Sequence, residues 1–308
     1  MRRRVLLVVV GVAVVAGLLV TVRLVVPGGD RAYDGPSADA VECRAGDVDR
    51  LDLSDPDQGR LAWHDEFSGT RIDPDRWTVR DDTTLSFDQA RIRADAVEVR
   101  GGRLRITARA DPAGDPSGER PATTGYLDTI GHFAQQHGRW EVRARLPVEP
   151  GRSRALWPAF WLRASDLPGE IDVVEAWGTP TSRQRAAMAE QYAWTVHEDT
   201  TAPPGYRRVG GWGRAAEPLA DGFHTYAVDW TPGCLRFSLD GRTTGFVDLD
   251  REPRLRRALA GPVDIRLNLQ VGSDYWGRLD PDRPSTTRLP ATFQIDHVRV
   301  FRPRPPRD

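Results

Sequence analysis

Residues 170–175 read Glu-Ile-Asp-Val-Val-Glu, and residues 157–162, slightly earlier in the chain, read Trp-Pro-Ala-Phe-Trp-Leu. The first segment predicts a β-strand. In a regular strand alternate side chains share a face, so Glu170 and Asp172 point one way and Glu175 points the other. One β-bulge between Asp172 and Glu175 returns the third carboxylate to the first face. The segment then presents three acids on one side of a sheet and its apolar residues to a core.

Short β-rich runs separated by Gly, Pro and Asp turn signals continue on both sides of this strand. They lie at residues 104–108, 138–146, 159–162, 170–175, 224–230, 235–239, 263–269 and 293–301. Two stretches, 182–191 and 251–259, are predicted as short helical inserts. The pattern favours an all-β sandwich or jelly roll, and residues 60–303 have a size that such folds reach as one domain.

The N-terminus predicts export of this domain. Residues 1–26 begin with three arginines and continue as an almost wholly apolar run over 5–22, which meets the length of about 18 residues that a membrane-spanning helix needs. The positive-inside rule keeps the arginines in the cytoplasm. A cleaved signal is the rival interpretation, with Ala38-Asp39-Ala40 as the cleavage motif. Residues 27–59, rich in Pro, Gly, Asp and Ser, are predicted to be a linker.

Composition excludes several classes of function. The formal net charge is -1 and the 43 basic residues are all arginine, so Schiff-base and Walker-type lysine chemistry is excluded. No basic patch indicates nucleic-acid binding. Cys43 and Cys234 are the only cysteines. In an oxidising compartment they form either a disulfide or two separate thiols, and the sequence leaves both open.

Three carboxylates on one strand face indicate chemistry, because burying like charges together brings no structural benefit. Glycoside hydrolysis uses one carboxylate as nucleophile and one protonated carboxyl as acid, and a third acid can tune both. The tryptophans at 157, 161 and 177 offer large flat apolar surfaces for stacking sugars. The alternatives are an acidic strand edge turned to solvent and tryptophans that belong to the core.

The chain resembles glycoside hydrolase family 16, in particular the laminarinase-like bacterial branch with a bulged EIDxxE strand. The motifs that carry the resemblance are 61–69 (LAWHDEFSG), 138–145 (GRWEVRAR), 157–162 (WPAFWL), 170–175 (EIDVVE), 222–232 (GFHTYAVDWTP), 267–272 (LNLQVG) and 293–301 (FQIDHVRVF). They appear in the family's order across nearly the whole predicted domain.

The resemblance implies a concanavalin-like β-jelly-roll sandwich with an open cleft. It also implies that Glu170 is the nucleophile, Glu175 the general acid/base and Asp172 the assisting carboxylate, with retention of anomeric configuration. No cofactor is required. Candidate sugar-binding residues are Trp157, Trp161, Trp177, His197, Asn268, Gln270 and Trp276. Structural roles for the histidine, the two amides and some tryptophans remain equally open.

A structural calcium ion, common in the family, would be held here by Glu66 and Asp296. Solvated or arginine-paired surface acids are the equal alternative. The predicted function is that of an extracellular endo-β-glycosidase, a monomer, bound to the membrane or secreted. Its favoured substrate is β-1,3-glucan, although residues 86–91 and 129–133 depart from typical laminarinases. A transglycosylase of the same family and a noncatalytic glycan-binding module are the alternatives.

Overall fold

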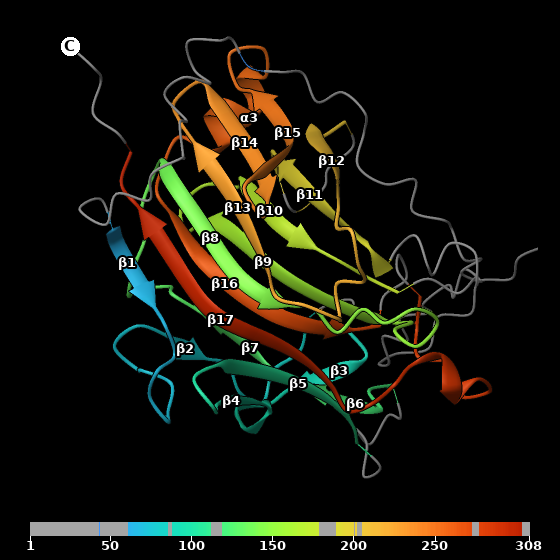
Figure 1. Cartoon of the computed structure of the whole chain (residues 1–308). Helices are drawn as coiled ribbons and strands as arrows, with labels where there is room; N and C mark the ends of the chain where they lie inside the picture. The colour runs from blue at the N-terminus through green and yellow to red at the C-terminus, as the bar shows by residue number, and fades with distance from the viewer. Residues whose placement is uncertain are drawn as a thin grey trace, which may run out of the picture.

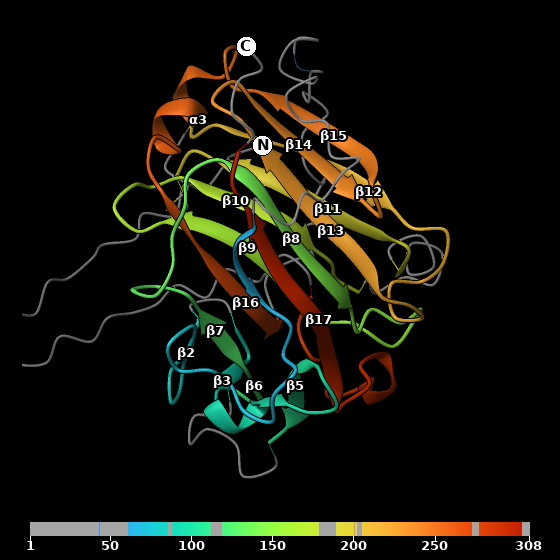
Figure 2. The ribbon, with the colours of Figure 1, turned by 60° about the vertical axis from the view of Figure 1, so that its left-hand side comes forward.

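The computed structural model describes residues 43, 61–85, 88–111, 119–178, 189–199, 201, 205–272 and 277–303. Two mainly antiparallel sheets packed face to face make up this part of the chain (Figure 1). Figure 2 shows β13, β14 and β17 of one sheet in front of β9, β10 and β16 of the other. The fold is an all-β jelly-roll sandwich, as predicted.

The larger sheet has ten strands in the described part of the chain. Its order is β15 (Arg242–Asp248), β14 (Cys234–Leu239), β13 (His224–Trp230), β8 (Gly138–Arg145), β17 (Ala291–Phe301), β5 (Leu104–Ala110), β6 (Ala122–Thr124) and β3 (Ala90–Ile92). In addition β1 (Leu61–Asp65) pairs with β17, and β4 (Val97–Val99) pairs with β5. The strands β3 and β6 form a parallel pair.

The smaller sheet, with seven described strands, carries the acidic segment. Its order is β12 (Arg208–Arg214), β11 (Gln191–His197), β10 (Glu170–Glu175), β9 (Leu156–Ala164), β16 (Val263–Val271), β7 (Tyr126–Asp128) and β2 (Thr78–Val79). One α-helix, α3 (Pro253–Ala258), and two short 3-10 turns, Ala94–Ala96 and Pro284–Thr286, complete the described elements.

The core fills the space between the two sheets. The face of β10 that points away from the larger sheet takes no part in this core. Alternate residues of β9 and β16, including Phe160, Leu162 and Leu267, are fully buried in it. Burial of such side chains contributes about 1.5–3 kcal/mol each. Because side chains alternate along a strand, Trp157 and Trp161 of β9 point to the opposite face of the sheet.

Trp194 shows how glycines in β12 and β15 fit the core. Its indole is buried between the sheets and stacks on Phe237 with ring centroids 4.4 Å apart. A Cβ added at Gly211 would lie 2.3 Å from this indole, and one at Gly245 would lie 2.0 Å from it. Only glycine therefore leaves room for Trp194 at these two positions.

The eight predicted strands are all present, most of them with ends extended by one to three residues. The helical insert predicted at 251–259 is α3. The other insert is wrong at its end, because Gln191 opens β11, while 182–188 lie outside the described residues. Nine further strands escaped prediction, and most are short or lie at sheet edges.

Cys43 and Cys234 form a disulfide with Cα atoms 6.0 Å apart, which resolves the alternative that the sequence left open. Cys43 is therefore fixed to β14 of the larger sheet. Within the described ranges no helix is long and apolar enough to span a membrane. The predicted anchor at 1–26 and all of the linker at 27–59 except Cys43 lie outside those ranges.

Candidate active site

The predicted bulge is present in β10. On β9, Asp172 pairs with Trp161, but the next partner of β9, Phe160, pairs with Val174. The register with β11 shifts over the same interval, between Asp172 and Glu175. Val173 and Val174 are both buried, at 1% and 0% exposure. One extra residue is thus accommodated, and Glu175 returns to the face that Glu170 and Asp172 occupy.

The strand register assembles these acids into rows on the outer face of the smaller sheet, which we call the site face. The first row is Asp264, Arg163, Glu170, His197 and Arg208, the second is Arg266, Trp161, Asp172 and Thr195, and the third is Asn268, Ala159, Glu175, Ala193 and Trp212. A fourth row pairs Gln270 with Trp157. The three carboxylates therefore lie in the middle of the sheet rather than at an edge.

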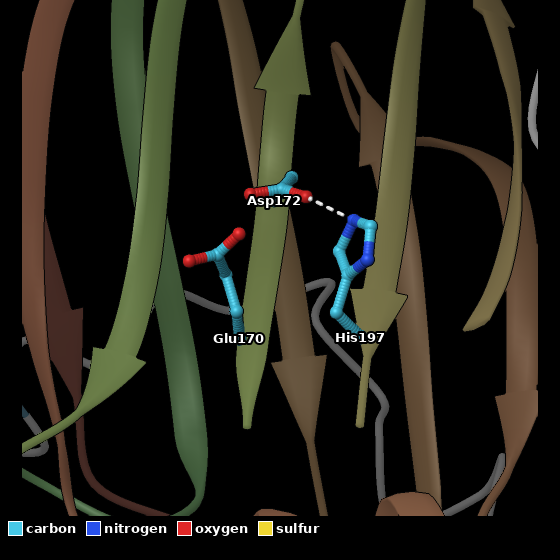
Figure 3. A group of neighbouring side chains, drawn as sticks. All are labelled: Glu170, Asp172 and His197. Atoms are coloured by element: carbon cyan, nitrogen blue, oxygen red, sulfur yellow. Dashed lines mark ion pairs between the residues drawn. The ribbon is translucent and has the colours of Figure 1, made fainter. Parts of the chain in front are cut away.

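Asp172 is bound by a histidine from the neighbouring strand. The His197 Nε2 atom lies 3.1 Å from Asp172 Oδ2. Figure 3 shows one Asp172 oxygen turned toward the His197 imidazole on β11, with the Glu170 carboxylate on the opposite side of β10 from His197. The Asp172 side chain is 6% exposed and that of His197 is 17% exposed. This compact group lies in a desolvated position that favours strong electrostatic coupling.

Burial dominates the ionisation of the group. It raises the pKa of Glu170 to about 8, with the Asp172 charge adding to the rise. It raises the pKa of Asp172 to about 8 as well. The pKa of Glu175 is raised well above its ordinary value by burial and by the charges of Asp172 and Glu170. Burial lowers the pKa of His197. Near neutral pH the group therefore retains protons on its carboxyls, Glu175 above all, beside an uncharged imidazole.

Two predicted tryptophans each donate a hydrogen bond on the site face. The Trp157 Nε1 donates to Glu175 Oε1 at 2.9 Å, and this bond opposes the rise in the pKa of Glu175. The Trp161 Nε1 donates to Asn268 Oδ1 at 2.7 Å. The Arg266 guanidinium lies over the Trp161 ring, 4.9 Å from the ring centroid. Arg266 thereby covers one face of the Trp161 ring. Trp157, in contrast, is hydrogen-bonded to Glu175, the candidate general acid.

Trp177 belongs to a small apolar cluster on the site face, separate from the main core. It packs with Ala193, and Trp157 and Trp212 pack against them. The rings of Trp177 and Trp212 lie 5.3 Å apart at 57°. Sequence reasoning missed Trp212. Its even spacing from Arg208 and Gly210 in β12 was the available signal, but the glycines of that strand concealed it.

The remaining sugar-binding candidates lie in different surroundings. Gln270 is 6% exposed, and its buried Nε2 atom has no hydrogen-bond partner among the residues that the structure describes. Trp276 lies outside the described residues. Contact between any of these side chains and a sugar stays a prediction. The sequence also gave no signal for Tyr206, whose ring is parallel to that of His197 with centroids 6.1 Å apart.

The proposed calcium ligands are paired with arginines. Both carboxylate oxygens of Glu66 accept hydrogen bonds from Arg299 at 2.8 Å. The Oδ2 of Asp296 accepts one from Arg143 at 2.9 Å. The structure therefore shows the arginine-paired alternative, and a calcium ion at these acids would have to displace both arginines. Calcium binding by these two acids stays a prediction.

Only one group in the described ranges has three His or acidic donors close enough for a metal ion, namely Glu170, Asp172 and His197, whose donor atoms lie within 4.8 Å of one another. It consists of the acidic strand and its histidine. The contact of His197 Nε2 with Asp172 Oδ2 at 3.1 Å already accounts for the arrangement, so no metal is assigned to it.

The model of glycosyl hydrolases family 16 matches residues 77–281. The chain belongs to this family. It is a glycoside hydrolase that acts on O-glycosyl bonds, and catalysis in family 16 requires no cofactor. The matched range contains the bulged strand, its histidine and all the described tryptophans of the site face.

Relatives of known activity extend over most of the chain at low identity. A glucan endo-1,3-beta-glucosidase A1 of Niallia circulans is 26% identical over 272 residues, which cover 79% of this chain and 38% of the relative. A beta-glucanase of Rhodothermus marinus is 29% identical over 265 residues, covering 79% and 85%. The solved laminarinase of Rhodothermus marinus is 26% identical, with a TM-score of 0.64 and coverage of 79% and 97%. This family 16 chain thus spans about two fifths of the first relative's length and most of the other two.

Proposed function

We propose that this protein is an extracellular retaining endo-β-glycosidase that hydrolyses β-1,3-glucan. The observation that carries the proposal is the bulged strand β10, which brings Glu170, Asp172 and Glu175 to the same face. The activities of the Niallia and Rhodothermus relatives support a β-glucan as the polymer. Retention is proposed because a paired nucleophile and acid on one strand suit double displacement.

Because burial raises the pKa of Glu170 to about 8, the reactive form is the one in which Glu170 has lost its proton while Glu175, the acid with the strongly raised pKa, still holds its own. In the first step Glu175 gives this proton to the glycosidic oxygen while Glu170 attacks C1. The bond from C1 to the leaving oxygen breaks, and an ester to Glu170 forms. In the second step Glu175, now ionised, takes a proton from water. The water oxygen attacks C1, the ester breaks, and both glutamates return to their starting states.

Trp157 is the best candidate for a sugar platform in this scheme. Its ring is partly buried next to the cluster of Trp177 and Trp212, and its Nε1 holds Glu175. A sugar that stacks on this ring therefore lies beside the acid that must protonate its glycosidic oxygen. We include Trp161, Asn268 and the other sugar-binding candidates in an open cleft above the site face.

Export and the oligomeric state are part of the proposal. The arginines and apolar run of residues 1–26 support a membrane anchor or a signal segment. The disulfide between Cys43 and Cys234 is consistent with an oxidising compartment. A monomer is proposed, because the sandwich has its own complete core. Calcium forms no part of the proposal.

The test is hydrolysis of laminarin, lichenan, agarose and xyloglucan by the full-length protein, with products sized by chromatography. We expect oligosaccharides from laminarin. Glu170→Gln should lower the rate at least about 1,000-fold, as loss of a nucleophile does. Glu149→Gln makes the same change at an acid paired with Arg288 outside the site face, and should leave the rate unchanged.

The alternatives give different products. Oligosaccharides longer than the starting material would indicate a transglycosylase. Tight binding of a polymer without cleavage by the folded wild-type protein would overturn hydrolysis and favour a noncatalytic glycan-binding module.

A further inference from the structure

The outer face of the larger sheet, which points away from the core, carries a group of arginines that the proposed hydrolysis does not use. On β5, β17 and β8, which lie side by side (Figure 1), Leu104, Ile295 and Ala144 are buried in the core. Because side chains alternate along a strand, the neighbours of these residues point outward. The outward arginines, which we call the basic strip, are Arg103, Arg105, Arg143 and Arg145.

The strand register places two arginines of the basic strip on either side of a glutamine. Gln294 on β17 pairs with Arg105 on β5 and with Arg145 on β8. Neighbouring strands lie about 4.8 Å apart, so the backbones of the two arginines are about 10 Å apart. The Nε atom of Arg105 is buried without a hydrogen-bond acceptor, and neither arginine has an acidic partner within the described residues. The arginines come from separate strands, so the linear sequence shows no basic run here.

Phe223 gathers guanidinium groups from both sides over this face. The centroid of its ring lies 4.8 Å from Cζ of Arg103, 5.2 Å from that of Arg143 and 5.9 Å from that of Arg145. Asp296 lies 3.6 Å from Arg103 Nε and 2.9 Å from Arg143 Nη1. One acid is thus shared by two of the four arginines. The basic strip keeps an excess of positive charge, and like charges held together favour an anionic partner.

We propose that the basic strip is a second polysaccharide-binding surface and that it takes an anionic polysaccharide, one whose sugars carry carboxylate groups. The planar fork of an arginine matches the two oxygens of a carboxylate. Arg103 and Arg143 have side chains that are each 39% exposed, and a single exposed ion pair contributes little binding free energy. A polymer that contacts several arginines at once binds much more tightly than a small anion does.

Acids beside the basic strip favour a single polymer chain over a flat anionic surface such as a bilayer. Glu98 on β4 is exposed and lies opposite Arg105 in the register, and Asp296 lies between Arg103 and Arg143. A flat surface would meet these acids as well as the arginines, whereas a chain can follow the arginines alone. The site face belongs to the other sheet, so a polymer on the basic strip leaves the three acids of β10 accessible.

The test measures binding of polygalacturonate to the full-length protein in a nonionic detergent, by isothermal titration calorimetry. Wild type should bind at about 50 mM NaCl and lose at least about tenfold in affinity at about 300 mM, because salt screens exposed charges. The double variant Arg105→Gln/Arg145→Gln should bind at least about tenfold more weakly than wild type at the lower salt concentration. No binding by wild type at that concentration would overturn the proposal.

A matched control removes the same charge elsewhere. Arg71 and Arg242 are exposed and lie outside the basic strip, so Arg71→Gln/Arg242→Gln should bind polygalacturonate within about twofold of wild type. Equal weakening in the two double variants would show a general charge effect and would overturn the proposal.

A third variant should gain affinity, which a misfolded protein cannot do. Glu98→Gln removes the acid opposite Arg105 and should tighten binding about two- to fivefold. Unchanged or weaker binding would contradict a carboxylate-bearing partner at Arg105.

Micelles that contain an anionic phospholipid serve as the competing probe. If Arg105→Gln/Arg145→Gln weakens attachment to these micelles and not to polygalacturonate, the basic strip faces a lipid surface and the proposal is wrong. None of these measurements requires cleavage of laminarin, so this proposal and the proposed function fail separately.

Discussion

Glu170, Asp172 and Glu175 have carboxyl groups that water would solvate better than this face of the sheet does. Their burial raises all three pKa values, to about 8 for Glu170 and Asp172. The shifts give the acid a proton to donate at neutral pH, which an ordinary glutamate does not have. The same burial lowers the stability of the folded protein once the three carboxyl groups lose their protons at higher pH.

Asp172→Asn should therefore stabilise the fold at alkaline pH. In wild type the folded state binds a proton that the unfolded chain has already lost, so the free energy of unfolding falls as the pH rises from about 4 to about 8. The neutral amide avoids this loss. We expect a gain of about 1–3 kcal/mol at pH 8.5 and almost none at pH 4, measured by denaturant unfolding.

Glu66 provides a control, because its pKa is shifted in the direction opposite to that of Asp172. Its pKa is lowered, chiefly by the hydrogen bonds from Arg299, so its contribution to stability is present above its ordinary pKa and is lost as the pH falls. Glu66→Gln should lower stability at pH 8.5. A loss of stability in Asp172→Asn at that pH would contradict the account of the site.

At the scale of single elements, β12 connects the core with the site face. On its core side Gly211 follows the buried Val209 and leaves room for Trp194, while its outer side carries Arg208 and Trp212. Glycine within a strand often marks a place where another group approaches the backbone closely, as the Trp194 indole does here. The position of Trp212 over Trp177 thus depends on how Trp194 is packed.

Gly211→Ala should destabilise the protein by about 1–3 kcal/mol, the usual cost of overpacking. The new Cβ would lie 2.3 Å from the Trp194 indole, so the strand or the ring must shift. Thermal unfolding measures the effect. At Gly222 the nearest atom to an added Cβ lies 3.8 Å away, so Gly222→Ala should be nearly neutral. Equal melting temperatures for the two variants would contradict this packing.

Eight of the longer strands were predictable from their own residue patterns, and the spacing of the acids in β10 also revealed its bulge, whereas β11 and β15, with seven residues each, were missed. Strands such as β2 and β7 have two or three residues, too few for a period to be detected. In β12 three of the seven residues are glycines, so the alternation of apolar and polar side chains cannot be detected. In the site, the acids and His197 were identified from motifs, whereas Arg266 over Trp161 depends on the register of strands about 100 residues apart.

For the whole molecule, the two sheets have separate roles. The smaller sheet bears the acids, the tryptophan cluster and His197, and the larger sheet bears the arginine-paired acids and the disulfide. Cys43 pairs with Cys234 across 191 residues of sequence. The bond therefore ties Cys43 to the sheet that carries none of the three acids of the site.

Replacing both cysteines by serine should lower the stability of the protein by about 2–4 kcal/mol, the usual contribution of a disulfide that closes a long loop. Activity at low temperature should be unchanged, because neither cysteine lies on the site face. Melting curves with and without reductant measure the effect. Reductant should lower the melting temperature of wild type and not that of the double variant, and an unaffected wild type would contradict a stabilising bond.

The central claim is that the bulged acidic strand cleaves a β-linked glucan by double displacement. Proton NMR of laminari-oligosaccharide hydrolysis by wild type, recorded within the first minutes, tests it most directly. Double displacement through Glu170 predicts that the new reducing end appears first as the β-anomer and only later equilibrates with the α-anomer. First appearance of the α-anomer, or no cleavage by the folded protein, would contradict the account.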